Sequence, residues 1–363
     1  MHLLTLSKRV DLGPAGIISP GDYLVEDLNG AQLMTFAGGG MMRPVSGPSS
    51  PVGQSDTLFI RAGGFGDLIL LTPVLREHKR RYPNARIAVA TMPHYAQVFD
   101  ALPYVDEVIQ YPIPLDVANR FSRWVVYENA IENNPRAEVV HMTELFGEIA
   151  GMDAPAYQGM DATALKPDYR VRITEGLAMD QKYPRTAKPR VCVQAKASAS
   201  GQCRVYPAPL MGAVVTKLLD KGWEVFMMGA KGEFRLGGNP RDGLRNLCPD
   251  DLSFRESAAV VNGADAFVGN DSSLLHVAGA LDIPAVGLFA PFPWKLRTAY
   301  SPSITAIQGN RGCECCYFHA NPVRGEHFPE HCPSKAKGYC QELALIEPAR
   351  IVALVEKVAR KRK

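Results

Sequence analysis

The strongest constraint on the fold is an alternation of short apolar runs with longer amphipathic stretches through most of the chain. Residues 58–60 and 86–90 are apolar runs of strand length, and between them Leu68, Leu71 and Leu75 lie on one face of a predicted helix. Parallel strands need such a crossover, because a tight turn joins only antiparallel strands. The pattern therefore predicts a parallel sheet with helices on both faces.

This alternation occurs twice, and a stretch with three prolines, between residues 165 and 189, separates the two series. Proline breaks a helix interior because it lacks the backbone N–H. Strands are expected at 108–109, 139–140, 191–193, 224–228, 266–268 and 285–289. We therefore predict an α/β fold of two Rossmann-like halves, at residues 56–180 and 181–345, followed by a helix and a basic tail at 346–363.

Residues 1–55 stand apart from the alternation. The strand-like stretches 23–28 and 31–36 flank Asn29-Gly30, a dipeptide that favours the type I′ turn of a two-residue hairpin. Residues 37–55 are rich in Gly, Pro and Ser, as flexible linkers are. We predict a small N-terminal β extension that a linker joins to the first half.

The composition indicates a folded cytoplasmic protein. Of the 363 residues, 46% are hydrophobic and 21% are charged, which is close to globular usage. The sequence has no apolar run of 18 residues and no typical signal peptide, so we expect neither a transmembrane segment nor secretion. Five of the last seven residues are basic, and they either form a solvated helix end or contact nucleic acid or anionic lipid.

The segment 269–273 lies where a predicted strand meets a predicted helix. Ligands of open α/β sheets bind outside the carboxyl ends of the strands, and a helix N-terminus there suits a phosphate. Ser272 and Ser273 can add hydroxyl donors, and His276 follows one turn later. Taken alone, a helix N-cap at Asp271 or Ser272 explains the segment as well.

Two further strand ends carry residues that suit a nucleotide. Arg204 precedes the first helix of the second half and can hold a phosphate with its planar fork. Gly229 follows another strand and admits a nucleotide close to the backbone, while Glu233 can accept from ribose hydroxyls. The predicted nucleotide site comprises Arg204, Gly229, Glu233, Asn270, Asp271, Ser272, Ser273 and His276. His94 and His141, near other strand ends, are interpreted as ordinary side chains.

Cysteines are concentrated near the end of the second half. Cys313 and Cys316, followed by Cys332 and Cys340, have a spacing compatible with tetrahedral zinc. A site of four thiolates is closed, so such a zinc would be structural. Free thiols and disulfides are the alternatives, and a reducing compartment disfavours disulfides.

Three segments carry a family resemblance: Gly66-Asp67 with the Thr72-Pro73 that follows, the stretch 103–109, and the stretch 269–289. They resemble glycosyltransferase family 9, the enzymes similar to ADP-heptose:lipopolysaccharide heptosyltransferases. The third segment matches the family's Asn-Asp-Ser/Thr-Gly-x-x-His pattern, with Ser273 in place of Gly. The resemblance extends from about residue 57 to the C-terminus.

The resemblance implies a GT-B fold, with a nucleotide-sugar donor, ADP-sugar favoured, in the second half and the acceptor in the first. It implies that Asp67 is the catalytic base, which deprotonates the acceptor hydroxyl as it attacks the anomeric carbon with inversion. From the residues alone, Asp67 is also interpreted as a helix N-cap. Arg204 stands where the family usually has Lys. The residues expected to contact the acceptor are Gly64, Phe65, Gly66 and Glu144.

The chain contains no Asp-x-Asp, the usual metal-ligand pair of the other common glycosyltransferase architecture. Charge on the leaving diphosphate is then met by Arg204, the helix start at 271–273 and Lys196. We predict an inverting, metal-independent transfer of a heptose or related sugar to a lipopolysaccharide-like glycan. Two alternatives remain: a glycosyltransferase acting on a nucleic acid base or a protein, and a non-catalytic nucleotide-sugar-binding protein, against which the presence of both Asp67 and Asp271 argues.

Overall fold

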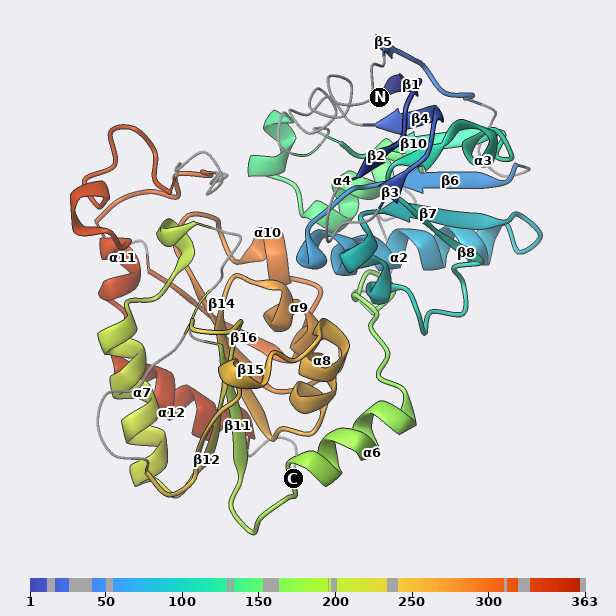
Figure 1. Ribbon diagram of the computed structural model, residues 1–363. Helices are drawn as coiled ribbons and strands as arrows, with labels where there is room; N and C mark the ends of the chain where they lie inside the picture. Colours follow the sequence, from blue (N-terminus) through green and yellow to red (C-terminus); the bar gives the residue numbers. More distant parts are fainter. Residues whose placement is uncertain are drawn as a thin grey trace. The chain divides into compact units, whose positions relative to one another are not determined.

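The computed structural model (Figure 1) describes residues 1–11, 17–25, 41–49, 55–128, 131, 134–152, 163–194, 196, 201–233, 241–309, 312–318 and 327–359. The chain divides into two compact units. Unit 1 comprises Met1–Asn134 and Thr143–Met160, and unit 2 comprises Pro135–Met142 and Asp161–Lys363.

Unit 1 contains a parallel sheet with the strand order β10-β6-β7-β8. Its strands are β6 (Thr57–Ile60), β7 (Ile87–Thr91), β8 (Glu107–Gln110) and β10 (Arg123–Val126). Helix α2 (Phe65–Arg81) connects β6 to β7, and Leu68, Leu71 and Leu75 are buried on it. The first strand–helix–strand unit predicted from the sequence is therefore confirmed.

The prediction of a strand at residues 139–140 is wrong. Val139 is 74% exposed and follows the short 3-10 helix η3 (Pro135–Glu138). The strand that completes the sheet is β10, which pairs in parallel with β6 from Arg123 to Val126. Two adjacent valines occur in both places, and only the pairing with β6 distinguishes an edge strand from an exposed turn.

Unit 1 also contains an antiparallel sheet with the order β5-β1-β4-β9. Its strands are β1 (His2–Leu6), β4 (Gly21–Val25), β5 (Met41–Pro44) and β9 (Ile113–Pro114), and the two short strands β2 (Val10–Asp11) and β3 (Ile17–Ile18) pair with each other. The expected N-terminal β extension is thus present, and β9 joins it to the first Rossmann-like half.

The pairing differs from the hairpin expected at residues 23–36. Strand β4 has β1 on one edge and β9 on the other at Tyr23 and Leu24, so both edges are occupied there. The rest of the expected hairpin, residues 26–36, lies outside the described residues. Strand β5 lies inside the stretch expected to be a linker.

Unit 2 contains a six-stranded parallel sheet with the order β13-β12-β11-β14-β15-β16. Its strands are β11 (Arg190–Gln194), β12 (Glu224–Met228), β13 (Leu244–Asn246), β14 (Ala266–Asn270), β15 (Ala285–Phe289) and β16 (Ile304–Gln308). The chain leaves β11 in one direction to β12 and β13, and in the other from β14 to β16. The switch point between β11 and β14 is where sheets of this kind bind ligands.

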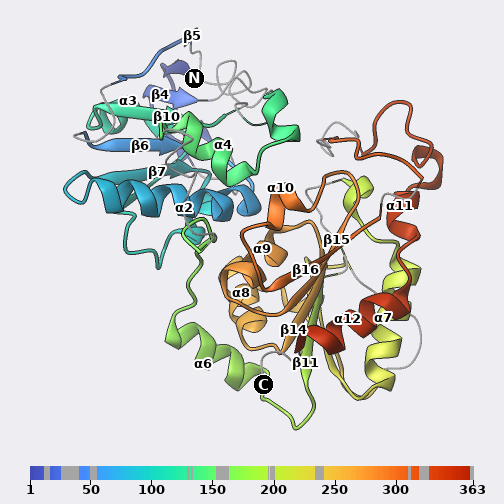
Figure 2. The same ribbon diagram turned by 180° about the vertical axis from the view of Figure 1, so that it is seen from behind.

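Two layers of helices cover this sheet. Figures 1 and 2 show α7 (Ala208–Asp220) and α12 (Pro348–Ala359) on one face, and α8 (Phe254–Asn262) and α9 (Ser273–Ala280) on the other. Strands β11, β12, β14 and β15 are buried along their whole length, as expected for a sheet covered on both faces. The prediction of a second Rossmann-like half is confirmed.

The remaining helical elements are short. They are η2 (Pro93–Val98), α3 (Leu115–Ala118), α4 (Met142–Ile149), α6 (Ile173–Lys182), η5 (Gln202–Arg204), η6 (Cys248–Asp250), α10 (Lys295–Thr298), η8 (Lys335–Lys337) and α11 (Gln341–Ala344). Within the described ranges, none of the helices has the length and apolar character needed to cross a membrane.

Candidate active site

The switch point of unit 2 brings the carboxyl ends of β11 and β14 together. Gln194 ends β11, and its side-chain oxygen accepts a hydrogen bond from the Ser272 hydroxyl just after β14. Ser272 occupies the N-cap position of α9, but its side chain makes no capping hydrogen bond. Ser272 is therefore the N-cap residue, as the alternative interpretation expected, but its hydroxyl links the ends of β11 and β14 instead of capping the helix. Ser273 is the first residue of α9.

Asp271 is a buried carboxylate at this point of the sheet. The Oδ2 atom of Asp271 lies 3.4 Å from Nη1 of Arg204, and Oδ1 lies 3.6 Å from Nε2 of His276. Burial would raise the pKa of Asp271, but the His276 contact and the charges of Arg204 and Arg297 outweigh burial and hold this pKa below its usual range. Asp271 is therefore ionised, and it neutralises positive charge inside the unit.

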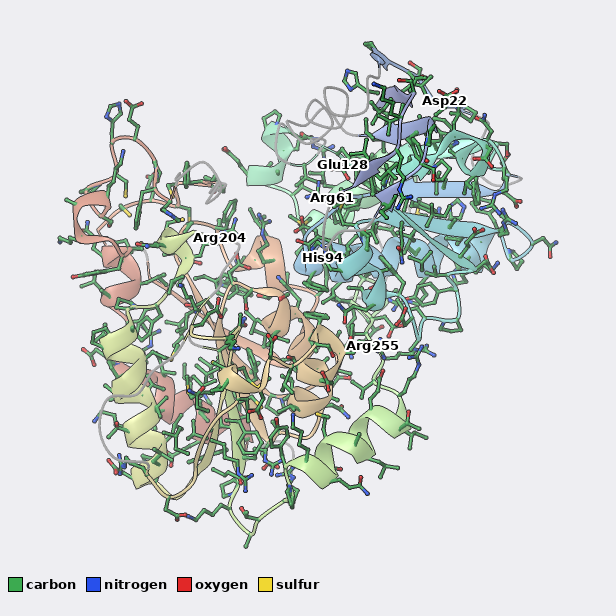
Figure 3. All side chains as sticks on the ribbon, in the orientation of Figure 1. Asp22, Arg61, His94, Glu128, Arg204 and Arg255 are labelled. Atoms are coloured by element: carbon green, nitrogen blue, oxygen red, sulfur yellow. The ribbon has the colours of Figure 1, made fainter. Side chains whose placement is uncertain are left out.

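Arg204 is held near Asp271 by two further contacts. The guanidinium carbon of Arg204 lies 4.5 Å from the centroid of the buried Phe292 ring. The side-chain oxygen of Asn270 accepts a 2.8 Å hydrogen bond from the backbone N–H of Tyr206, so the end of β14 anchors the segment that carries Arg204. Within the described structure, Nε of Arg204 has no hydrogen-bond partner. Figure 3 labels Arg204.

Two histidines are buried in the same region. His276 lies on α9, and its Nδ1 has no hydrogen-bond partner among the residues that the structure describes. The His141 ring lies 4.4 Å from that of Tyr300. Burial, together with the charge of Arg297 and His276, lowers the pKa of His141 to about 3, so this side chain is neutral near pH 7. Proximity to the site was not expected for His141.

The predicted Gly229 directly follows the neighbouring strand β12. A Cβ atom at this position would lie 2.8 Å from Oε2 of Glu233 and 3.2 Å from Sγ of Cys248, so a larger residue would displace the Glu233 side chain. The Glu233 carboxylate accepts a 2.9 Å hydrogen bond from the backbone N–H of Ala230. Since β12, β11 and β14 are adjacent and parallel, the predicted nucleotide residues all lie at one edge of one sheet. Lys196 is exposed beyond the end of β11.

Unit 1 places Asp67 in the first turn of α2. Gly64 is the N-cap residue, so the interpretation of Asp67 as an N-cap is wrong. Nη2 of Arg61 lies 2.6 Å from Oδ2 of Asp67, and Arg61 also donates to the backbone oxygens of Gly63 and Tyr127, each at 3.2 Å. Arg61 therefore fixes one oxygen of the carboxylate, while 28% of the Asp67 side chain stays exposed.

The glycine loop before α2 requires its small residues. Gly64 has φ of 88°, a left-handed value that suits glycine, and a Cβ atom there would lie 2.7 Å from Oδ2 of Asp67. A Cβ atom at Gly63 would lie 2.9 Å from the Tyr95 ring. The rings of Phe65 and Tyr95 are 4.6 Å apart at 82°, so Phe65 is packed on this loop.

Among the other predicted acceptor residues, Gly66 is the second residue of α2, and Glu144 is half-buried in the first turn of α4. The sequence prediction did not include Glu128, whose carboxylate accepts from the backbone N–H of Ala62 beside the loop. Arg61, Glu128 and His94 are labelled in Figure 3.

The four cysteines proposed as metal ligands line one cavity of about 40 Å³ in unit 2. The buried Cys203 lines the same cavity, directly before Arg204 in the chain. Burial, followed by the charges of nearby Glu342 and cysteines, raises the pKa of Cys313 to about 11. In the part of the chain that the structure describes, no group of three or more His, Cys, Asp and Glu side chains is arranged to hold a metal ion. The four thiols have the donor chemistry of a metal site and share one cavity.

The fold and the site define a class of protein: an α/β chain whose second unit has the strand order and the charged strand ends of a nucleotide-binding domain. The family model of glycosyltransferase family 9 (heptosyltransferase) matches residues 116–325. The chain belongs to glycosyltransferase family 9. The family resemblance and the enzyme class predicted from the sequence are confirmed.

Curated relatives agree with this assignment. The chain is 23% identical over 348 residues to lipopolysaccharide heptosyltransferase 2 of Salmonella typhimurium. This match covers 81% of this chain and 96% of that protein. It is 30% identical over 113 residues to lipopolysaccharide heptosyltransferase 1 of Pseudomonas aeruginosa, and this match spans about a third of that protein's length (32%).

Solved structures share the fold. The E. coli ADP-heptose lipopolysaccharide heptosyltransferase II superposes with a TM-score of 0.65 at 18% identity, over 85% of this chain and 99% of that one. The iron-containing dodecameric glycosyltransferase TibC of enterotoxigenic E. coli superposes with a TM-score of 0.61 at 16% identity, over 99% of this chain and 92% of that one. The GT-B-like fold is confirmed.

The sequence prediction missed Arg61, Phe292, Arg297 and His141 as parts of these sites. Arg61 had a usable signal, because it is a basic residue directly after a buried strand and shortly before Asp67. Phe292 and Arg297 had none, since they follow β15 in the chain and only the packing of unit 2 brings Phe292 to Arg204 and Arg297 near Asp271.

Proposed function

We propose that this chain transfers a sugar from a nucleotide donor, bound at the carboxyl ends of β12, β11 and β14, to a hydroxyl of a glycan acceptor bound by unit 1. The observation that supports the donor site most strongly is the buried set of charged residues at the switch point, with Asp271 ionised between His276 and Arg204. A diphosphate suits this edge because the N-terminus of α9 presents backbone N–H groups and Arg204 presents a positive charge.

Asp67 is proposed as the base. Its other oxygen, Oδ1, accepts the proton of the acceptor hydroxyl while the hydroxyl oxygen attacks the anomeric carbon. The bond from that carbon to the diphosphate breaks on the opposite side, so the configuration inverts. Arg61 orients the carboxylate through the 2.6 Å contact, and such positioning is worth large factors in rate. A general base typically contributes about 10²–10⁴-fold.

The leaving diphosphate requires neutralisation of its developing charge. Arg204, the N-terminus of α9 and Lys196 are proposed to supply it, as preorganised donors do in other enzymes. Because the sequence lacks an Asp-x-Asp pair, the transfer step is proposed to be independent of metal. Glu233 is proposed to bind the ribose, and Gly229 to leave room for the nucleoside.

ADP-heptose is the proposed donor. The E. coli relative is named as an ADP-heptose enzyme, and TibC has been solved in complex with ADP-D-beta-D-heptose. The proposed acceptor is a lipopolysaccharide-like glycan, since both curated relatives carry lipopolysaccharide in their names. The cytoplasm is the proposed compartment, because among the described residues none of the eight cysteines forms a disulfide and disulfides are rare there.

The test is a transfer assay with a panel of ADP- and UDP-sugars against three acceptors: a lipopolysaccharide core oligosaccharide, a nucleic acid and a protein. We expect transfer from ADP-heptose to the oligosaccharide, with the inverted anomer identified by NMR. Transfer to nucleic acid or protein instead would replace the proposed acceptor and keep the donor site. Nucleotide binding without transfer to any acceptor would favour a non-catalytic binding protein.

We also propose a structural metal bound by Cys313, Cys316, Cys332 and Cys340, which line one cavity. Zinc is the expected ion for four thiolates, and iron is the second candidate because TibC is described as iron-containing. Elemental analysis of protein purified without chelator decides between them. Less than one tenth of an equivalent of either metal, about the level of contamination, would reject the proposal.

A further inference from the structure

Phe292 lies in direct contact with two guanidinium groups. The guanidinium carbons of Arg204 and Arg297 lie 4.5 Å and 4.4 Å from the centroid of this one ring. The two guanidinium carbons are therefore no farther apart than the sum of these two distances, in a region where Phe292 and Arg297 are both buried. Like charges repel at such separations, and the single carboxylate of Asp271 offsets only one of the two, so an anion bound beside them would be stabilised.

The segment that carries Phe292 is itself rigidly held. Gln308, at the end of β16, accepts a 3.0 Å hydrogen bond from the backbone N–H of Trp294 and donates to the backbone oxygens of Ala290 and Phe292, each at 3.3 Å. The edge of the Tyr317 ring packs against Phe292, with the centroids 6.0 Å apart. Phe292 is thus a fixed platform rather than a side chain that adapts to its neighbours.

Arg204 depends on this platform for its position. Its contact with Asp271 is long, at 3.4 Å, and its Nε has no hydrogen-bond partner in the described part of the chain. Stacking on an aromatic ring orients a planar guanidinium while leaving its N–H groups free for a ligand. A lysine ammonium at the same place would keep the charge but lose both the stacking and the fork.

We propose that Phe292 is a positioning residue in the site that binds the diphosphate of the donor. Its ring holds the guanidiniums of Arg204 and Arg297 in place. Arg204, whose side chain is 15% exposed, contacts the diphosphate. The buried Arg297, whose guanidinium carbon lies 4.4 Å from the centroid of the same ring, adds positive charge to the site. This inference rests on the proposed donor site and specifies which ring and which cation make it selective for a diphosphate.

The experiment measures calorimetric binding of ADP and of adenosine to the full chain. Phe292→Leu should weaken ADP about tenfold and leave adenosine unchanged, because only ADP carries the phosphates. Phe292→Tyr, which keeps a ring, should bind ADP within about twofold of the wild type. Phe267→Leu is the matched control, because it makes the same substitution at another buried phenylalanine, which lies on β14. Among the described residues, no guanidinium lies over the Phe267 ring.

Arg204→Lys tests the same contact without changing the core. We expect about a tenfold loss for ADP, and the double variant Arg204→Lys/Phe292→Leu should lose less than the product of the single losses, since both remove one interaction. Equal weakening of ADP and adenosine in Phe292→Leu, or wild-type ADP binding in either single variant, would overturn the inference. A wild-type chain that binds neither ADP nor UDP would overturn the donor site and this inference together.

Discussion

The two units each carry an aspartate beside the start of a helix that follows a parallel strand, and an arginine approaches each one. Asp67 of unit 1 leaves 28% of its side chain exposed, and Arg61 contacts one of its oxygens at 2.6 Å. Asp271 of unit 2 leaves 6% exposed, and it contacts Arg204 and His276. The residue type and the location along the fold are the same, so burial separates the roles. An exposed carboxylate can exchange a proton with a ligand, whereas a buried one among cations serves as a fixed charge.

Asp67→Asn should give the largest effect, because the amide cannot accept the proton of the acceptor hydroxyl. We expect kcat for sugar transfer to fall about 10²–10⁴-fold. The free energy of unfolding should fall by about 0.5–3 kcal/mol, because the buried Arg61 loses its ionised partner while Asp67 itself is partly exposed. Steady-state kinetics and urea unfolding on the same preparation check both parts. Unchanged turnover would reject Asp67 as the base.

Asp271→Asn should mainly lower the free energy of unfolding, whereas Asp67→Asn should mainly lower kcat. It removes a buried carboxylate from Arg204 and Arg297, and breaking a buried ion pair from one side costs roughly 3–5 kcal/mol. Urea unfolding of this variant beside Asp67→Asn measures the difference directly. If Asp67→Asn were the more destabilised of the two, burial would not be what separates the two aspartates.

Gly64→Ala should cost about 1–3 kcal/mol of stability, because φ at this residue is 88° and the added Cβ would lie 2.7 Å from the Asp67 carboxylate. The displaced Asp67 should also lower kcat. Gly212→Ala is the matched control: this glycine lies inside α7, and an added Cβ meets nothing within 4 Å. That substitution should stabilise the protein by about 0.5–1 kcal/mol. Thermal and urea unfolding compare the two variants, and equal effects would remove the argument for strain at Gly64.

His78 gives the smallest expected effect near neutral pH, and it extends the comparison to a buried histidine of unit 1. Burial, with the charges of Arg123, Arg81 and Lys79, lowers the pKa of His78 to about 4. The unfolded chain then binds more protons than the folded one between about pH 6.5 and 4, so stability falls as pH falls through this window. His78→Phe should make unfolding less dependent on pH there and leave the profile above pH 7 parallel to the wild type. Identical slopes in both proteins would contradict the assignment.

The expected fold was largely correct because its signals are local. Short apolar runs identified β7, β11, β12, β14 and β15, which are buried along their whole length. Helical periodicity identified α2, whose Leu68, Leu71 and Leu75 are buried. The prediction of a strand at residues 139–140 was wrong because the apolar run there is too short to show the periodicity of a helix or a strand. The interpretation of Asp67 as an N-cap failed because α2 begins at Phe65, before the aspartate.

The sequence by itself determined the two α/β series, the strand ends that carry Asp271 and Glu233, and the family, because these depend on short segments read in order. Only the tertiary structure decided which distant residues meet. It brought Phe292 and Arg297 to Arg204, Cys203 to the other cysteines, and β9 to the N-terminal sheet. Such contacts follow from the packing of a whole sheet and its helices, and no local pattern encodes them. The opposite exposures of Asp67 and Asp271 belong to the same category, since burial is a property of the surroundings and not of the residue.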